Sequence, residues 1–183
     1  MPPGAANPTP KLLCLAGFMG CGKTTVGRLL ARQLGWRFVD LDTLIEERAG
    51  LSIAAIFEQR GEAAFREMES AALERTIGEV TERDQSCVVA LGGGTFVQPQ
   101  NLALLRAVGC PVVWLYCSPE RLLARCALMP NRPLFRDEAS FRQLYEQRLP
   151  FYEQADYRVE SESPPARVVE QILALGILER VNV

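Results

Sequence analysis

The hydrophobic residues fall into short continuous runs, which alternate with longer stretches where apolar positions recur every three or four residues. The short runs predict strands buried on both faces at 12–16, 38–41, 88–91, 112–116 and 157–159. The longer stretches predict helices at 24–34, 43–49, 53–60, 62–80, 100–107, 119–127, 138–154 and 165–179. Apolar strands separated by helices are typical of a parallel sheet covered on both faces, so the pattern predicts an α/β fold.

The chain as a whole has the properties of one globular domain. Its 183 residues suffice for a single well-packed core, and no repeat or linker divides residues 11–183. Residues 1–10 are rich in proline and lack both a positively charged start and an apolar segment, so we expect a disordered lead-in rather than a signal peptide. No apolar run approaches the roughly 20 residues of a membrane span, so we expect no membrane partner.

Charge and residue usage exclude several classes of function. The net charge of −2 does not indicate the basic surface that a nucleic-acid partner would require. The six cysteines form no CxxC pair and several lie in apolar runs, which favours a reducing cytoplasm over a disulfide framework. The absence of histidine from the sequence excludes most metal-hydrolase and Ser-His triad chemistry, so an acid or base must be a carboxylate, a lysine or a tyrosine.

The pattern Gly17-x4-Gly22-Lys23-Thr24, between the first strand and the first helix, predicts a phosphate-binding loop (P-loop). Glycines at 17, 20 and 22 let the backbone curl so that N–H groups converge on a phosphate. Lys23 can reach the outer phosphates, and the hydroxyl of Thr24 can bind Mg²⁺. A tight turn with an accidental lysine is the alternative, but the full pattern with these flanks is rare by chance. We expect nucleotide contacts from Gly20, Cys21, Gly22, Lys23, Thr24 and Thr25.

Two carboxylates, Asp40 and Asp42, follow the second predicted strand. Ligands of open parallel sheets bind at the carboxyl ends of the strands, so both should overlook the P-loop. We predict that Asp40 holds Mg²⁺, directly or through water, and that Asp42 binds the acceptor hydroxyl, either as its base or only to orient it. The side chains share a face if Leu41 continues the strand and diverge if the chain turns there. The alternative is a helix N-cap aspartate beside a solvated one.

Arg66 lies in the segment GExxFRxxE, which opens a long predicted helix. Its spacing from Glu62 (i,i+4) and from Glu69 (i,i+3) fits a solvated ion-pair face. The alternative is that Arg66 points inward and binds an anionic group of the substrate, because guanidinium pairs with carboxylate through two parallel hydrogen bonds.

Three consecutive glycines, Gly92, Gly93 and Gly94, directly follow the third predicted strand. They would let backbone approach a ligand closely and offer it N–H groups, so we predict substrate contacts; a simple tight turn is the alternative. A P-loop hydrolase would often place a metal-binding aspartate at the end of this strand. This chain has Leu91 and the glycines there, which leaves Asp40 as the metal carboxylate.

The stretch 121–136 is basic, contains no acidic residue, and includes two prolines in MPNRP (129–133). Because proline interrupts a helix, we predict a loop or short lid here. Arg125 and Arg132 flank it, and arginines that close over a site can neutralise charge on a transferring phosphoryl group and exclude water. Arg148 lies in a later helical stretch. Taken singly, each of these arginines is equally well explained as a solvated surface residue.

Together these motifs resemble the shikimate kinase family. The segments that carry the resemblance occur in the family's order and run from Lys11 to Leu178: GFMGCGKTTVG, FVDLDTLIE, SIAAIFEQRGEAAFREME, LGGGTF, NRPLF and QRLPFYEQADY. Many kinases share the P-loop, whereas the DxD, GExxFRxxE and GGG motifs together are far more specific. The resemblance implies a three-layer P-loop kinase with a five-stranded parallel sheet in the order 2-3-1-4-5, a substrate-binding region at about 41–70 and a mobile lid at about 127–138.

The resemblance also implies that ATP with Mg²⁺ phosphorylates the 3-hydroxyl group of shikimate, on the route to chorismate and the aromatic amino acids. ATP and shikimate are then the partners, and we expect a monomer. Around shikimate the resemblance places Asp42, Arg66, Gly93 and Arg148. Phe57 and Phe65 would form an apolar wall of the pocket, and burial in the core is an equally good explanation of these two residues. It gives catalytic roles to Lys23, Asp42 and Arg132, with Arg132 at the phosphates and Arg125 near the adenine. Two departures are the acidic segment 160–164, where the family often has a basic residue near the adenine, and RPLF for the common RPLL in the lid.

Two other classes of protein remain open from the sequence. Another small-molecule P-loop kinase, such as a gluconate or adenylyl-sulfate kinase, would share the P-loop, but the paired aspartates and the Phe65-Arg66 motif favour shikimate. A non-catalytic nucleotide-binding module would be expected to have lost residues such as Lys23 or Asp42, and these are present. No segment resembles the NKxD motif that reads guanine, so a GTP switch is not indicated.

Overall fold

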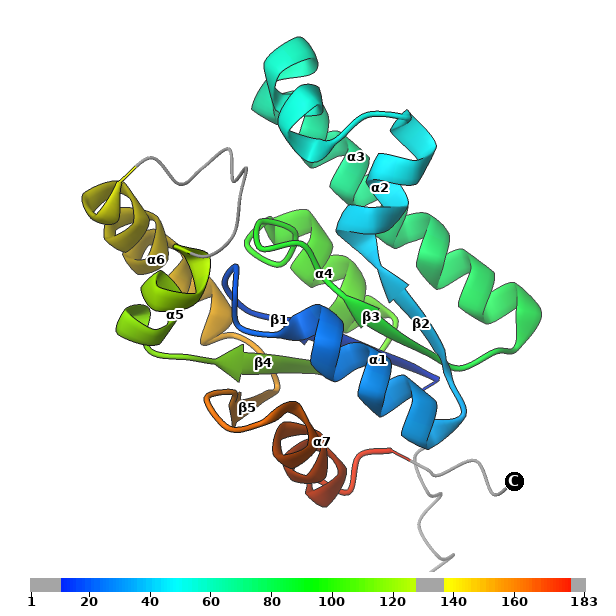
Figure 1. Cartoon of the computed structure of the whole chain (residues 1–183). Helices are drawn as coiled ribbons and strands as arrows, with labels where there is room; N and C mark the ends of the chain where they lie inside the picture. Colours follow the sequence, from blue (N-terminus) through cyan, green and yellow to red (C-terminus); the bar gives the residue numbers. More distant parts are fainter. Residues whose placement is uncertain (1–10, 128–136, 179–183) are drawn as a thin grey trace, which may run out of the picture.

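A computed structural model describes residues 11–127 and 137–178 of the chain (Figure 1). Its centre is a five-stranded parallel sheet in the order β2-β3-β1-β4-β5. The strands are β1 (Leu12–Ala16), β2 (Arg37–Asp40), β3 (Cys87–Ala90), β4 (Val112–Tyr116) and β5 (Tyr157–Glu160). The predicted strand order and parallel pairing are confirmed.

The helices cover both faces of this sheet, which gives the three layers that were predicted. They are α1 (Lys23–Leu34), α2 (Leu41–Ala49), α3 (Ile53–Arg83), α4 (Pro99–Ala107), α5 (Pro119–Cys126), α6 (Glu138–Tyr152) and α7 (Pro165–Ala174). Figure 1 shows α1 and α7 side by side on one face, whereas α3 and α4 lie on the opposite face.

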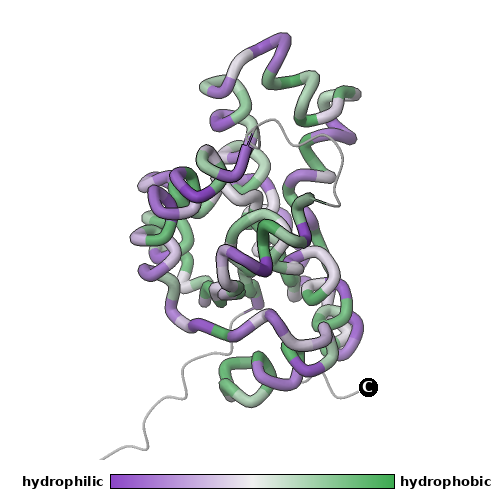
Figure 2. The backbone as a smooth tube through the Cα atoms, turned by 60° about the vertical axis from the view of Figure 1, so that its left-hand side comes forward, coloured by the Kyte–Doolittle hydropathy of each residue, from purple (hydrophilic) through white to green (hydrophobic). Residues whose placement is uncertain are grey.

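The core is built on β1, the middle strand, in which Leu13, Cys14 and Leu15 are fully buried. β1 pairs with β3 on one side, Leu13 opposite Val88, and with β4 on the other, Leu15 opposite Val113. In Figure 2 the helices alternate between hydrophobic (green) and hydrophilic (purple) segments, as expected of helices that turn one side toward a sheet. Within residues 11–127 and 137–178, the helices lack the length and apolar character needed to cross a membrane.

In the first half of the chain, one predicted boundary is wrong and one predicted helix break is present as a kink. Leu41 does not extend β2, because Asp40 caps a helix that begins at Leu41. The predicted helices 53–60 and 62–80 form a single element, α3, in which Gly61 alone has a non-helical backbone, with φ 81° and ψ 171°. The predicted break is therefore present as a kink.

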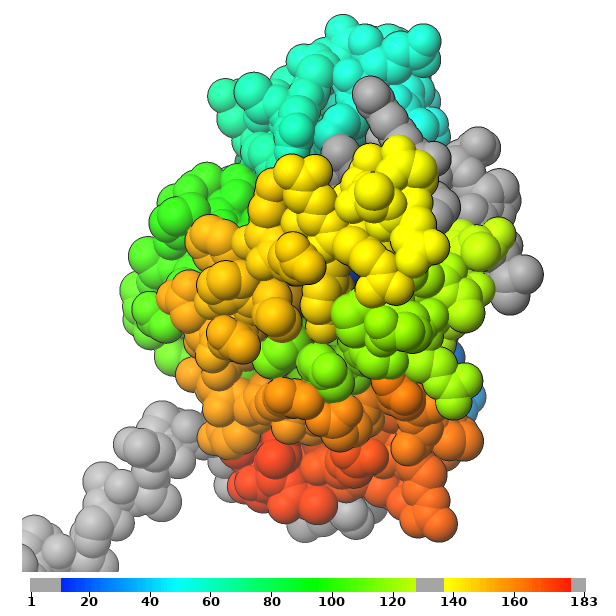
Figure 3. Space-filling view, turned by 90° about the vertical axis from the view of Figure 1, so that its left-hand side faces the viewer, coloured from blue at the N-terminus to red at the C-terminus, as the bar shows by residue number. Residues whose placement is uncertain are grey.

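The last two helices end earlier than the hydrophobic pattern predicts, α6 at Tyr152 instead of 154 and α7 at Ala174 instead of 179. Gly176 has a φ of 69°, which directs the chain out of α7. Figure 3 shows α6 (yellow) as the outer layer on its side of the molecule, next to α5 (yellow-green) and above the segment from β5 to α7 (orange to red). The inner side of α6 is buried, and it carries Tyr145, Arg148 and Tyr152.

The parallel topology brings three chain segments to one edge of the sheet. β1 continues into the P-loop, β2 ends at Asp40, and β3 is followed by Gly92–Gly94. Since parallel strands end at the same edge, the residues of the candidate site meet there although they are far apart in the sequence.

Candidate active site

The loop between β1 and α1 has the backbone conformation of an anion-binding nest. Gly17, Gly20 and Gly22 have φ angles of 143°, 80° and 100°. Gly17 is also required for close packing, because a Cβ there would lie 2.7 Å from Cys21 Sγ and 2.8 Å from the carbonyl oxygen of Leu115. Gly22 directly precedes α1, so the positive end of the helix dipole adjoins the loop.

The ammonium group of Lys23 lies within this loop. Its Nζ donates hydrogen bonds to the carbonyl oxygens of Gly17 at 2.8 Å and Phe18 at 3.1 Å. Cys21 is buried, and its Sγ lies 3.8 Å from the same nitrogen. Thr25 is exposed on the first turn of α1. The structure thus brings together the cation and the loop that were predicted to bind phosphates.

Thr24 and Asp40, the two predicted metal ligands, are in direct contact. Thr24 Oγ1 donates a hydrogen bond of 2.6 Å to Asp40 Oδ2. Their oxygens are the hard ligands that Mg²⁺ prefers. Within the described part of the chain no group of three or more His, Cys, Asp or Glu side chains is arranged to hold a metal ion. A Mg²⁺ ion at Thr24 and Asp40 would therefore complete its coordination with phosphate oxygens and water, as Mg²⁺ commonly does.

Asp40 and Asp42 diverge, because the chain turns into α2 at Leu41. Asp40 Oδ1 accepts hydrogen bonds from the backbone N–H groups of Asp42 at 3.1 Å and Thr43 at 3.3 Å, so Asp40 is the N-cap of α2. The carboxylate of Asp42 faces the glycine segment instead: a Cβ on Gly92 would lie 2.6 Å from Asp42 Oδ1. Asp40 can both cap the helix and bind a metal ion, because the cap uses Oδ1 and leaves Oδ2 on the side of Thr24.

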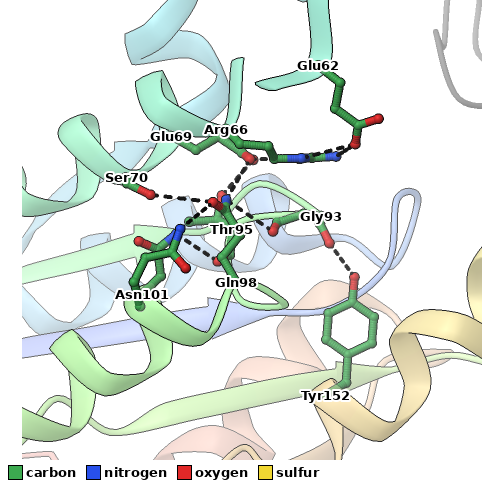
Figure 4. A network of polar contacts seen from close by, with 11 residues as sticks. Glu62, Arg66, Glu69, Ser70, Gly93, Thr95, Gln98, Asn101 and Tyr152 are labelled. Atoms are coloured by element: carbon green, nitrogen blue, oxygen red, sulfur yellow. Dashed lines mark hydrogen bonds and ion pairs between the residues drawn. The ribbon is translucent and has the colours of Figure 1, made fainter. Parts of the chain in front are cut away.

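Arg66 is held by two carboxylates that differ in burial (Figure 4). Its Nη1 donates to Glu69 Oε2 at 2.7 Å, and its Nη2 donates to Glu62 Oε1 at 2.8 Å. The side chain of Glu69 is 1% exposed and that of Glu62 is 58% exposed. Burial alone would lower the pKa of the Arg66 guanidinium, but the charges and hydrogen bonds of the two carboxylates outweigh it and raise the pKa. The predicted solvated ion pair is therefore the one between Arg66 and Glu62, whereas the pair between Arg66 and Glu69 is buried on the side of Glu69.

Glu69 was predicted only as an ion-pair partner of Arg66 on a solvated face, and its burial was not predicted. Besides Arg66, it accepts hydrogen bonds from Thr95 Oγ1 at 2.8 Å and from Gln98 Nε2 at 3.1 Å. A buried carboxylate with three such donors is well compensated for its lost hydration. The signal that could have revealed it is its position four residues after Phe65 and four before Leu73, both buried, which puts an acidic residue within an apolar helix stripe.

Each of the three consecutive glycines adjoins a different side chain of the site. Gly92 faces the carboxylates of Asp42 and Glu69, and a Cβ on Gly93 would lie 3.1 Å from Nη1 of Arg148. A Cβ on Gly94 would overlap the guanidinium of Arg66. The segment therefore lets charged groups from α2, α3 and α6 approach one stretch of backbone.

Arg148 differs from Arg66 in having no carboxylate of its own. Its side chain projects from α6, is buried with 6% exposure, and has its Cζ 5.6 Å from the centre of the Phe18 ring. Within residues 11–127 and 137–178 it forms no ion pair. A buried cation without a counter-charge carries a large desolvation cost, which an anionic ligand would offset.

Phe57 and Phe65 are in contact, with ring centres 4.8 Å apart and a tilt of 42°. The Cζ of Arg66 lies 5.9 Å and 5.5 Å from the centres of these two rings. Phe65 is buried and Phe57 is half-buried. The structure therefore places an apolar surface directly beside the guanidinium of Arg66.

Arg125 connects the P-loop to the segment after β5. Its Nη1 donates to the carbonyl oxygen of Gly20 at 3.1 Å, and its Nη2 donates to that of Ser161 at 3.3 Å. In the acidic segment that follows, Glu162 Oε1 accepts the N–H of Ser118 at 2.9 Å at the start of α5. Arg132 and nearly all of the predicted lid lie outside the described residues.

Comparisons with a family model and with curated proteins point to the same family. The family model described as shikimate kinase matches residues 19–175. Among curated proteins, the chain is 44% identical over 162 residues to the shikimate kinase of Moorella thermoacetica, covering 87% of this chain and 90% of that protein. It is 47% identical over 150 residues to the shikimate kinase of Geobacter sulfurreducens, covering 80% of each chain.

Solved structures agree with these sequence matches. A shikimate kinase from Acinetobacter baumannii in complex with shikimate superposes with a TM-score of 0.83 at 37% identity, covering 91% of this chain and 92% of that one. A gluconokinase from Sinorhizobium meliloti superposes with a TM-score of 0.59 at 20% identity, covering 92% of each chain. At that identity the likeness to the gluconokinase concerns the fold alone.

Proposed function

The chain belongs to the shikimate kinase family, and we infer that it transfers the γ-phosphoryl group of ATP to the 3-hydroxyl group of shikimate, on the route to chorismate and the aromatic amino acids. The structural observation that best supports this function is the environment of Arg148. A buried guanidinium without an ion-pair partner in the described part of the chain, beside Gly93, suits a small acceptor that brings its own carboxylate.

We propose that the acceptor lies between α2, α3, α6 and the segment Gly92–Gly94. Arg148 pairs with its carboxylate, and Arg66, held in place by Glu69, supplies a second guanidinium. Asp42 binds the hydroxyl groups, while Phe57 and Phe65 contact the apolar face of the ring. Support comes from the contacts that join these side chains around the three glycines.

For the phosphoryl donor, we propose that the N–H groups of the loop 17–22 bind the phosphates of ATP. Lys23 stabilises the charge that develops on the transferring group, and Arg132 adds a second cation from the lid. Arg125 lies near the adenine, an assignment supported by its contacts with the P-loop and Ser161. Asp42 orients the 3-hydroxyl for in-line attack and receives its proton directly or passes it to solvent. Positioning and charge stabilisation supply most of the catalysis in such transfers.

Mg²⁺ is the metal that we propose for this reaction. Thr24 and Asp40 would hold it, the hydroxyl directly and the carboxylate directly or through a water molecule, as the oxygen donors 2.6 Å apart support. When bound with ATP, the ion neutralises negative charge on the β- and γ-phosphates.

The remaining expectations about partners and location also belong to this proposal. A monomer that works in the cytoplasm, without nucleic acid or membrane, is consistent with a net charge of −2 and with six buried cysteines that form no disulfide. Buried thiols of raised pKa, as for Cys87 at about 11 because of burial, are poorly reactive.

The assay that tests the proposed function measures ADP release from ATP and Mg²⁺ with shikimate, gluconate or adenylyl sulfate as the acceptor. We expect turnover that depends on shikimate, with the other two acceptors near the background rate. Faster release with gluconate or adenylyl sulfate would assign the chain to another class of small-molecule kinase. Nucleotide binding without turnover on any acceptor would identify a binding module.

A further inference from the structure

The backbone of Gly92–Gly94 has all three of its carbonyl groups bound by the protein. The carbonyl of Gly92 accepts the N–H of Thr95 at 3.0 Å, that of Gly93 accepts the hydroxyl of Tyr152 at 2.6 Å, and that of Gly94 accepts the amide of Gln98 at 3.4 Å. Within the described residues, the N–H groups of these glycines have no protein acceptor. The turn therefore offers donors, and not acceptors, to a bound molecule.

The contact with Tyr152 is the shortest of the three and is the one that comes from another layer of the molecule (Figure 4). Tyr152 is the last residue of α6, one helical turn after Arg148, and it is 1% exposed. Its ring stacks on Trp114 of β4, with centres 6.1 Å apart and planes 23° from parallel. Burial raises the pKa of the Tyr152 hydroxyl although the charge of Arg148 opposes the rise, so the group is a neutral donor at physiological pH.

The geometry of a peptide explains what this hydrogen bond controls. In a planar trans peptide the C=O of one residue and the N–H of the next point in opposite directions. A hydroxyl that binds the carbonyl of Gly93 therefore directs the N–H of Gly94 away from α6. Glycine has no side chain that could hold the peptide in that orientation, so the orientation depends on partners such as Tyr152.

The same tyrosine lies beside the cation of the site. A Cβ on Gly93 would lie 3.1 Å from Arg148 Nη1 and 3.9 Å from the hydroxyl of Tyr152. The spacing of four residues between Arg148 and Tyr152 brings both to the same side of α6. One helix face thus supplies the group that would bind the substrate and the group that holds the adjacent backbone.

We propose that Tyr152 is a positioning residue for shikimate: its hydroxyl fixes the peptide between Gly93 and Gly94, so that the N–H groups of the turn and Arg148 face the same ligand. This inference rests on the proposed function. It does not make Tyr152 a catalytic residue, because the tyrosine acts through the glycine backbone and not on the reacting atoms.

The test is the variant Tyr152→Phe, with Tyr145→Phe as its matched control. Both changes remove the hydroxyl of a tyrosine on the inner side of α6, and within the described residues only that of Tyr152 binds the backbone of Gly92–Gly94. For Tyr152→Phe we expect the KM for shikimate to rise about five- to ten-fold, with the KM for ATP and kcat each within about two-fold of the parent enzyme. Tyr145→Phe should leave all three constants unchanged.

A second readout does not depend on turnover. The ¹⁵N amide resonance of Gly94 should shift in Tyr152→Phe and stay in place in Tyr145→Phe, and calorimetry with shikimate alone should show the same loss of affinity as the KM. The proposal would be overturned if Tyr152→Phe and Tyr145→Phe had the same KM for shikimate. It would also be overturned if Tyr152→Phe lowered kcat and left the KM for shikimate unchanged. Loss of the cooperative thermal transition in Tyr152→Phe would also overturn it, because the tyrosine would then be a structural residue. If the parent enzyme shows no shikimate-dependent turnover, it is the proposed function that fails.

Discussion

Thr24 and Asp40 share a hydrogen bond of 2.6 Å that joins the first turn of α1 to the end of β2. The second oxygen of Asp40 caps α2 through the N–H groups of Asp42 and Thr43. One side chain therefore fixes the start of the helix that carries Asp42 and also reaches the predicted metal ligand on the P-loop helix. The same carboxylate therefore contacts both the helix that carries Asp42 and the helix that follows the P-loop.

The variant Asp40→Asn separates the helix-capping role of Asp40 from its predicted role in binding Mg²⁺. Asparagine caps helices about as well as aspartate, so the free energy of unfolding should change by less than about 0.5 kcal/mol. The loss of charge should raise the Mg²⁺ concentration for half-maximal rate and lower kcat by about ten-fold or more. A Mg²⁺ titration of the rate, together with thermal melts, measures both. Asp84→Asn, at the exposed end of α3, is the control; an unchanged Mg²⁺ dependence in Asp40→Asn would remove Asp40 from the metal site.

Glu69 and Glu62 bind the same guanidinium at nearly the same distance and differ chiefly in burial. Glu69→Gln should raise the KM for shikimate about ten-fold, because Arg66 loses its buried anchor, and should lower the free energy of unfolding by about 1–3 kcal/mol. Glu62→Gln removes an exposed partner and should change each quantity little. Steady-state kinetics and urea melts of the two variants provide the comparison. Equal effects in both would show that burial of Glu69 is irrelevant to the position of Arg66.

Arg148→Gln and Arg66→Gln should both lower kcat/KM for shikimate, by about 100-fold for Arg148, and should have opposite effects on stability. Arg148 has no ion-pair partner within residues 11–127 and 137–178, so its removal relieves an uncompensated buried charge and should raise the Tm. Removal of Arg66 leaves the buried Glu69 without its cation and should lower the Tm. Arg142→Gln, on the exposed side of α6, is the control for both. A lowered Tm in Arg148→Gln would mean that the arginine has an internal counter-charge.

Acid should weaken a surface network centred on Glu79. Hydrogen bonds from Arg37, at 2.9 Å, and from Arg75, at 3.2 Å, hold the pKa of Glu79 below its usual value. Because the folded pKa is the lower one, the stabilisation is complete above the unfolded pKa of about 4.3 and is lost as the pH falls through the folded value. Glu79→Gln should therefore lower the free energy of unfolding by up to about 1 kcal/mol at pH 7 and have no effect near pH 2. Urea melts at both pH values measure this, with the exposed Glu58→Gln as the control; an equal effect at both pH values would contradict it.

Local patterns were sufficient to predict most of the fold. β1 and β4 have the predicted bounds, because a short continuous apolar run is typical of a strand that is covered on both faces. The boundary at Leu41 was missed because an apolar residue suits the end of a strand and the start of a buried helix equally well. Only the contacts of Asp40 with the following N–H groups decide between them.

The ion pairs of Arg66 with Glu62 and Glu69 follow from local spacing and were predicted, whereas contacts between residues distant in the sequence were not. The burial of Glu69 depends on Thr95 and Gln98, which lie more than twenty residues away in the sequence and meet it only through the packing of α3 against α4. Glu146 is near Arg148 in the sequence, but residues two apart on a helix do not face each other, so the two do not pair. Such pairings are properties of the assembled layers and leave no local signature.

The kink at Gly61 divides α3 into two helical segments that point in different directions. Phe57 belongs to the first segment, while Phe65 and Arg66 belong to the second. Phe57, which contacts Phe65, therefore lies on a different segment from Arg66, whose guanidinium Glu69 holds in place. In the binding mode proposed above, the segment before Gly61 would contact the acceptor through an apolar ring, and the segment after it would supply the charged contact.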